Sequence, residues 1–451
     1  MRDIVDVARR QLGYYLRNCA SGPAAGLLGD IMIKAFQFIE GRPDDEPPQQ
    51  MRELQRTLPG RLRRYKSPGK SGESLERNVP FAREEFGLDE VDSEILLLLL
   101  RYERNCMLEG FADEVGSRIE SVSKTIAALL GIDAREAHRR ILPDGALVAS
   151  GVLSLNHQGK GFAGPAGLLQ IAWPLRKVMF RPYETRGQWA NDMLGPPLEP
   201  SLGWEDFEHL GQVRELAAGV LAGATERGAS GVNLFVYGPV GTGKTEFCKT
   251  LAAKCGLKLW SVGEADEQGG EPVRPERLAS LRLAQHLLRH RKDAAILFEE
   301  AEDLLDASGC IGPQHFRELN GSKVYINRQI EQNAVPVLWT CNDVDCIDPA
   351  VLRRMTLPIE IDTPNQPVRA RIWRRIAADV GLALDDAAVS RLSSRQASPA
   401  VAANAARVAV LAGGGEATID EAVGHMLRAL GIPASGGIGF MPQRPEGGRR
   451  S

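Results

Sequence analysis

The sequence has no long hydrophobic run, no large excess of one charge and no paired cysteine motif. Its longest uninterrupted apolar run, residues 95–100, is far shorter than the ~20 residues of a membrane-spanning helix, and no signal-type apolar segment follows Met1. Lys and Arg number 55 against 58 acidic residues, so the net charge of −3 points to neither nucleic acid nor an anionic membrane. The seven cysteines are scattered without a C-x-x-C pair, as is typical of reduced thiols. We therefore expect a cytoplasmic protein that does not engage a membrane.

The first 80 residues change composition once. Residues 1–42 carry two segments with apolar side chains at the helical period, which predicts an N-terminal helical element. Residues 43–80 are rich in proline and basic side chains, and the stretch 51–83 holds nine Lys or Arg against three Asp or Glu. This composition predicts an extended linker. Its cations could contact phosphates, which leaves nucleic acid open as a partner.

Residues 81–186 show the pattern of a small recruitment domain. Three helical segments precede an apolar stretch that is expected to form a hairpin turning at Ser150-Gly151, which is the order of a winged-helix module. The segment 135–140, which would be its recognition helix, is only weakly basic, so docking of a protein client is favoured over DNA. The Pro- and Gly-rich residues 187–203 are predicted to be a second linker.

A phosphate-binding loop follows an apolar strand pattern at residues 233–237. The motif G-x-x-x-x-G-K-[ST] stands between this strand and a helical stretch, which is the context that it requires. Glycines allow successive backbone N–H groups to point at phosphate oxygens, and the start of the helix adds its positive dipole end. The lysine would bridge the β- and γ-phosphates of ATP, and the threonine hydroxyl would bind Mg²⁺. The loop consists of Gly238, Pro239, Val240, Gly241, Thr242, Gly243, Lys244 and Thr245.

Polar residues end the next two predicted strands. Glu299 and Glu300 follow the apolar run 294–298, and Asn342 follows the run 335–340. Carboxyl ends of parallel strands are where open α/β sheets bind their ligands. We expect Glu299 to hold Mg²⁺, and Glu300 and Asn342 to position the attacking water. A structural cap of the helix that follows the acidic pair is the alternative reading of these carboxylates.

Two adjacent arginines follow a short predicted helix, 348–352. In a ring assembly, Arg354 or Arg353 could reach the nucleotide of the neighbouring subunit, where a planar cation stabilises the charge of the transition state. We rank Arg354 first and Arg353 second. A solvated helix end is the simpler alternative.

Together these motifs resemble those of the AAA+ ATPases, specifically the AAA-type proteins with a single ATPase module. The loop resembles Walker A, Phe298-Glu299-Glu300 resembles Walker B, Thr340-Cys341-Asn342 resembles sensor 1, and 348–354 resembles the arginine-finger segment. The resemblance implies an αβα sandwich with a parallel five-stranded sheet over 204–362 and a helical lid over 363–432. It also implies that Phe207 and His209 lie near the adenine, that Ser398 begins the lid helix facing the nucleotide, and that the subunits form a ring, most often a hexamer. Residues 433–451 are predicted to be a disordered tail.

Two departures from the family pattern affect function. Glutamate takes the place of the usual aspartate at Glu299, so hydrolysis could be slow. The segment 264–270, where relatives present an aromatic pore-loop residue, is acidic here and has no aromatic residue. The favoured reading is an ATPase that remodels a protein client. A nucleotide-gated scaffold with little turnover, or a DNA-associated ATPase, are the alternatives.

Overall fold

The computed structural model describes residues 2–23, 25–40, 53, 56–58, 60–65, 74–155, 162, 169–263, 274–305 and 327–432. The chain divides into two compact units, Met1–Pro197 with Trp260–Phe298, and Leu198–Leu259 with Glu299–Ser451. Most of the predicted linker 43–80, the segment 264–270 and the predicted tail 433–451 lie outside the described residues. No helix within the described ranges has the length and apolar character that crossing a membrane requires.

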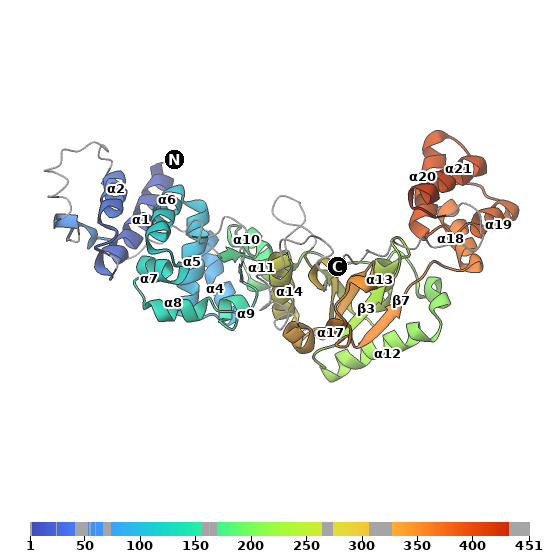
Figure 1. The fold of residues 1–451 in the computed structure, drawn as a ribbon, viewed down its shortest axis with the longest axis horizontal. Helices are drawn as coiled ribbons and strands as arrows, with labels where there is room; N and C mark the ends of the chain where they lie inside the picture. Colours follow the sequence, from blue (N-terminus) through green and yellow to red (C-terminus); the bar gives the residue numbers. More distant parts are fainter. Residues whose placement is uncertain are drawn as a thin grey trace, which may run out of the picture. The chain divides into compact units, whose positions relative to one another are not determined.

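The N-terminal helices form one core rather than separate elements. The two helices predicted within residues 1–42 are confirmed, and they pack with the helices that follow (Figure 1). Tyr15 and Leu16 are fully buried, and Asn18 Nδ2 donates to Leu129 O at 2.9 Å. The helices are α1 (Arg2–Ser21), α2 (Gly29–Glu40), α4 (Ser74–Phe86), α5 (Glu90–Arg104), α6 (Cys106–Ile119), α7 (Val122–Leu130) and α8 (Ala134–Arg140).

The hairpin predicted at Ser150-Gly151 is wrong. Residues Ala146–Ala149 form a short helix, α9, and the strand that follows, β1 (Leu153–Leu155), pairs antiparallel with β2 (Leu169–Ile171). A short apolar run suits a buried helical turn as well as a strand, and here the turn is helical. Helices α5 to α9, rather than three helices, precede the antiparallel strand pair, and the strands are joined through residues 156–168.

The predicted linker 187–203 contains an ordered helix in its first half. Helix α10 (Trp173–Met179) leads to α11 (Arg186–Leu194), and Thr185 caps α11 by accepting a hydrogen bond from the backbone N–H of Gln188 at 3.3 Å. Trp189 of α11 is fully buried beside the rings of Phe81 and Phe86. Burial of this large side chain makes α11 a part of the N-terminal core.

Helix α14 (Arg274–Leu288) packs into the same core, although it is distant in sequence. Leu283 and Leu287 belong to the apolar cluster of the N-terminal helices. The buried guanidinium of Arg282 donates to Val148 O at 2.6 Å. His286 Nε2 lies 3.0 Å from Glu85 O, and burial together with the charge of Arg289 lowers the pKa of His286 to about 4.

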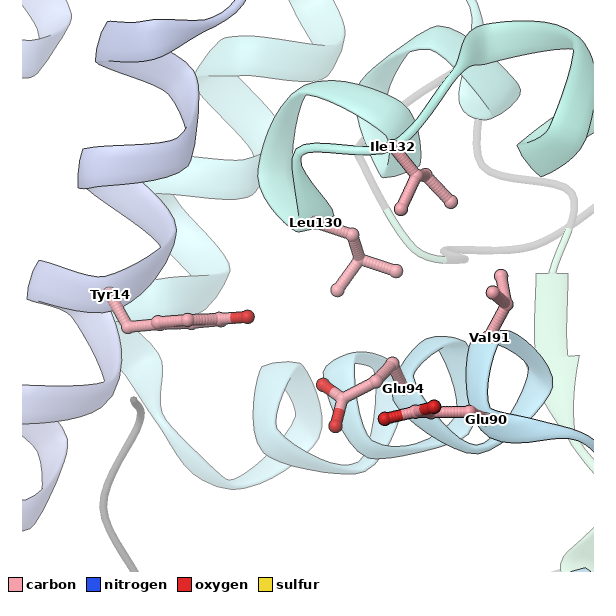
Figure 2. A pocket seen from close by; sticks show the side chains of 6 residues that line it. All are labelled: Tyr14, Glu90, Val91, Glu94, Leu130 and Ile132. Atoms are coloured by element: carbon pink, nitrogen blue, oxygen red, sulfur yellow. The ribbon is translucent and has the colours of Figure 1, made fainter. Parts of the chain in front are cut away.

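A cavity of about 190 Å³ opens among the N-terminal helices. Figure 2 shows Tyr14 of α1 pointing toward Leu130 at the end of α7, with Glu90 and Glu94 on the neighbouring α5. Val91 and Ile132 complete the wall. Burial raises the pKa of Glu94. The cavity thus combines two carboxylates, a phenol and aliphatic side chains.

The five-stranded sheet predicted for the C-terminal part is confirmed, with the order β4-β5-β6-β3-β7. Strand β3 pairs in parallel with β6 and with β7, with Val236 opposite Thr340 and Ile359. The strands are β3 (Asn233–Tyr237), β4 (Lys258–Ser261), β5 (Ala294–Phe298), β6 (Val337–Cys341) and β7 (Leu357–Glu360). Strands β3, β5 and β6 are almost entirely buried, as their continuous apolar runs predict.

The predicted helical lid forms a bundle around its own apolar cluster (Figure 1). Trp373 and Leu392 are buried within it. Its helices are α18 (Gln366–Asp379), α19 (Asp386–Ser394), α20 (Pro399–Ala412) and α21 (Glu416–Ala429). Ser398 caps α20, since its side chain accepts from Val401 N and Pro399 occupies the first helical position. The helix therefore begins where the sequence predicts.

Candidate nucleotide-binding and hydrolysis site

The loop between β3 and α13 (Lys244–Lys254) requires its glycines. Gly238 has φ +144°, and a Cβ there would lie 2.1 Å from Ile361 O. Gly243 has φ +97° and precedes the first residue of α13. Side chains other than glycine rarely adopt these conformations. The loop therefore curls tightly against the end of the sheet and delivers the start of α13, as the motif predicts.

Lys244 lies buried inside this loop. Its Nζ donates to Gly238 O at 2.8 Å and to Pro239 O at 2.9 Å, and only 7% of the residue is exposed. Burial lowers the pKa of Lys244, and the negative charge of Glu302 opposes that shift. Thr242 Oγ1 also donates to Pro239 O, at 2.9 Å. The lysine is thus held among the loop carbonyls, within reach of a phosphate that the loop amides would bind.

Thr245 and Glu299 meet although 54 residues separate them. Thr245 Oγ1 donates a hydrogen bond to Glu299 Oε1. A hydroxyl and a carboxylate oxygen are hard donors of the kind that Mg²⁺ takes alongside phosphate oxygens and water. Within the described residues there is no group of three or more His, Cys, Asp or Glu side chains that could hold a metal ion. By the chemistry of these two oxygen donors, the pair fits a magnesium ion that arrives with a nucleotide.

Glu300 is exposed and has an unusual backbone conformation. Its φ of +50° lies in the left-handed region, which is uncommon for a residue other than glycine. Such strain costs of order 1–3 kcal/mol and is concentrated at functional sites. The turn separates the directions of the two acidic residues, so that Glu299 contacts Thr245 while Glu300 stays accessible.

Asn342 contacts an acidic residue that the sequence analysis did not assign to the site. Glu302 Oε1 accepts hydrogen bonds from Asn342 N at 3.2 Å and from Asn342 Nδ2 at 2.8 Å. Glu302 is the first residue of α15 (Glu302–Leu305), three positions after Glu299. Glu299 lies before the helix and Glu300 between them is left-handed, so no helical spacing in the sequence indicates the contact of Glu302 with Asn342.

The predicted adenine segment forms η1 (Trp204–Leu210), which leads to α12 (Gln212–Arg227). Phe207 is 3% exposed and its ring contacts that of Phe247 on α13, while His209 is half-buried. Burial lowers the pKa of His209, which favours a neutral ring at pH 7. Arg375 of the lid pairs with Asp206 at 2.5 Å, which ties this segment to α18.

The start of α20 contacts the phosphate loop. Ala400 N donates to Gly241 O at 3.3 Å, and Gly241 has φ +78°. A Cβ at Gly241 would lie 2.9 Å from Ala400 Cβ and 3.0 Å from Ser398 Oγ. The contact brings the beginning of this lid helix to the loop that the sequence predicts to bind phosphate.

The two arginines after α17 (Pro349–Leu352) differ in their surroundings. Arg354 Nε donates to Glu331 Oε1 at 2.6 Å, and its NH1 donates to Ala350 O at 2.5 Å. Arg353 is exposed and makes no side-chain hydrogen bond or ion pair with the part of the chain that the structure describes. The residue ranked second by sequence is thus the accessible one within a single subunit.

This geometry defines a P-loop nucleotide-binding domain, because a glycine-rich turn, a buried lysine and a threonine–carboxylate pair converge at the end of a parallel sheet. Comparison with known proteins indicates which family of P-loop proteins this domain resembles. Residues 234–363 match the family described as "ATPase family associated with various cellular activities (AAA)". The match covers the segment in which the four motifs resemble those of the AAA+ ATPases.

Known relatives match only part of the chain. An "AAA ATPase forming ring-shaped complexes" from Micrococcus luteus is 30% identical over 220 residues, which is 44% of this chain and 35% of that protein. Spastin from Drosophila persimilis is 25% identical over 168 residues, covering 36% of this chain and 21% of spastin. The crystal structure of the FIGL-1 AAA domain in complex with ADP superposes with a TM-score of 0.38 and 17% identity, covering 48% of this chain and 75% of that one. The chain therefore spans about a third of the length of the Micrococcus luteus relative and about a fifth of the length of spastin.

Proposed function

We propose that the protein binds Mg-ATP and hydrolyses it to ADP and phosphate, and that it uses the cycle to remodel a protein client. The observation that carries the proposal is the hydrogen bond between Thr245 and Glu299, since it joins the phosphate loop to the acidic pair. A glycine-rich turn alone would not need an acidic partner there. The AAA family match over 234–363 supports the same reading.

Each candidate residue has a role that follows from its chemistry. The loop amides and Lys244 bind the phosphates, and Phe207 and His209 lie beside the base. Thr245 and Glu299 would hold the magnesium ion, which neutralises phosphate charge when it is bound. Glu300 accepts a hydrogen bond from the attacking water, and Asn342 orients that water. In this assignment Glu299 binds the metal ion and Glu300 activates the water, and the left-handed backbone at Glu300 allows the two side chains to have different roles.

We further propose a homo-oligomeric ring, with a hexamer as the expected size. The printed name of the Micrococcus luteus relative, which describes ring-shaped complexes, supports the ring. In such a ring an arginine acts on the nucleotide of the neighbouring subunit. Arg353 can do this without losing a partner within the described residues, whereas Arg354 must first leave Glu331. Both remain candidates, and the exposure of Arg353 raises its rank.

Residues 1–186 are the proposed site of client recruitment. The cavity beside Tyr14 offers carboxylates and aliphatic walls, a lining that suits a basic side chain of a protein better than a phosphate backbone. Nucleic acid is therefore the less favoured partner. The winged-helix-like arrangement of the helices and the β1–β2 pair stays a proposal, as does a cytoplasmic location.

The decisive experiment compares Glu300→Gln with the unaltered protein. We expect the variant to bind ATP with similar affinity and to lose turnover roughly 100-fold or more, because the amide cannot take up a proton from water. Glu421→Gln, which alters an exposed carboxylate on the lid helix α21, is the matched control for binding and folding. Equal turnover in Glu300→Gln and the unaltered protein would remove Glu300 from the mechanism.

A mixing experiment tests action between subunits. Lys244→Ala subunits bind ATP weakly and are expected not to hydrolyse it, and Arg353→Ala or Arg354→Ala subunits cannot supply the corresponding arginine. If the arginine crosses an interface, mixing the two inactive kinds restores some turnover. An arginine whose alanine variant keeps full turnover by itself is not the acting residue, and an inactive variant that mixing does not rescue argues against action between subunits.

A nucleotide-gated scaffold is the second candidate. Glutamate at position 299 supports it, because the longer side chain must withdraw by about one methylene to hold the same magnesium shell as an aspartate. Tight ATP binding with negligible turnover, unchanged by added client protein, would favour the scaffold. Turnover that rises with a client would favour remodelling.

A further inference from the structure

Glu302 holds the residue that follows β6. Both the backbone N–H and the side-chain Nδ2 of Asn342 donate to the same oxygen, Glu302 Oε1, at 3.2 and 2.8 Å. The start of α15 is itself tied to β6, because Ala301 N donates to Thr340 O at 2.8 Å. The carboxylate and the amide are therefore attached to a common frame, and the orientation of the amide is fixed.

The second carboxylate oxygen of Glu302, Oε2, does not accept a hydrogen bond from Asn342. Glu302 Oε2 is shielded from solvent and receives no hydrogen bond from an N–H or O–H group of the described residues. A buried carboxylate oxygen without a donor is costly. The negative charge also acts on its surroundings, since burial and then the charge of Glu302 raise the pKa of the Cys341 thiol to about 12.

We propose that Glu302 is a positioning residue for ATP hydrolysis, which fixes the Asn342 amide so that Oδ1 and the second N–H of Nδ2 remain available to the attacking water. This inference rests on the proposed ATPase function. With one N–H of Nδ2 bound to Glu302, the amide cannot rotate to exchange its oxygen and nitrogen. Holding a water-orienting group in one orientation before the substrate arrives lowers the entropy cost of reaching the transition state.

The first test is steady-state ATP hydrolysis by Glu302→Ala and Glu302→Gln. We expect Glu302→Ala to lower kcat roughly 10- to 100-fold with a much smaller change in KM. Glu302→Gln should recover part of the loss, because its amide oxygen can still accept from Asn342. Glu416→Gln, which removes the charge of an exposed ion pair with Arg391 on the lid, should leave the rate unchanged.

A double-mutant cycle distinguishes positioning from a general effect on folding. If Glu302 acts through Asn342, adding Glu302→Ala to Asn342→Ala causes little further loss of kcat. Fully multiplicative losses would overturn the proposal, and so would a wild-type kcat in both Glu302 variants.

Hydrogen exchange supplies a readout that does not depend on turnover. The backbone N–H of Asn342 should exchange faster in Glu302→Ala than in the unaltered protein without nucleotide, while exchange in β3 stays the same. Unchanged exchange at Asn342 would overturn the proposal. If the unaltered protein binds ATP without hydrolysing it, the proposed function and this inference fail together. If it hydrolyses ATP and only the Glu302 variants behave as wild type, this inference alone is rejected.

Discussion

Replacing Gly151 by alanine tests whether α14 belongs to the N-terminal core. Gly151 has φ +81°, and a Cβ there would lie 2.4 Å from Ala279 O and 2.6 Å from Leu283 N. Both are backbone atoms of α14, so no side-chain rotation can relieve the contact. Alanine at this position therefore requires α14 to move away from the turn that follows α9.

The expected cost has two parts. The left-handed conformation costs alanine roughly 1–2 kcal/mol. Displacement of α14 also breaks the buried hydrogen bond from Arg282 to Val148 O, and an unsatisfied buried group costs about 1–3 kcal/mol. We therefore expect Gly151→Ala to lower the free energy of unfolding of the N-terminal unit by about 3 kcal/mol.

Urea unfolding followed by tryptophan fluorescence measures this cost, because Trp189 is buried in the same unit. Hydrogen exchange in α14 should accelerate in parallel. Gly110→Ala is the matched control, since Gly110 lies inside α6 and a Cβ there meets nothing within 4 Å; it should gain up to about 1 kcal/mol from helix propensity. An unfolding midpoint and α14 exchange in Gly151→Ala equal to those of the unaltered protein would refute the reasoning.

Three further outcomes are expected. Lys244→Ala should raise the Kd for ATP roughly 10- to 100-fold, because it removes a charge-assisted contact with phosphate, and calorimetry would show an unchanged Kd if the lysine does not face the ligand. Gly241→Ala should weaken ATP binding about tenfold, since φ +78° strains alanine and its Cβ meets Ser398 Oγ at 3.0 Å; an equal Kd would argue against the contact between lid and loop. Because the pKa of His286 is about 4 when folded and about 6.5 when unfolded, the unfolded chain takes up a proton first, so stability present above pH 6.5 should fall as the pH drops toward 4. His286→Asn should flatten that slope in urea unfolding between pH 7.5 and 5, and an identical slope would contradict the assignment.

Local sequence patterns were sufficient for the strands that carry the site. The runs 233–237 and 294–298 match β3 and β5 in both bounds, because each is a continuous apolar segment closed by polar residues or glycine. The phosphate loop could be predicted equally well, because all of its residues lie in one short segment. Asn342 could be placed at the end of its strand for the same reason.

Long-range contacts were not readable in this way. The turn expected at Ser150-Gly151 depends on where β1 finds its partner, and that partner, β2, begins 14 residues after β1 ends. The role of Glu302 depends on a hydrogen bond to a residue 40 positions later. The ion pair of Arg354 with Glu331, which leaves Arg353 the more accessible of the two arginines, likewise joins residues 23 positions apart. None of these leaves a periodic signal in the sequence.

The place of α14 has a consequence for how this chain can be divided. Leu283 and Leu287 of α14 are buried by helices from the first 197 residues. A fragment beginning at residue 198 would therefore expose the apolar face of α14 to solvent. Such a fragment should aggregate even though it retains every motif of the AAA ATPase domain. We therefore expect that the segment matched by the AAA family does not fold independently when it is separated from the N-terminal helices.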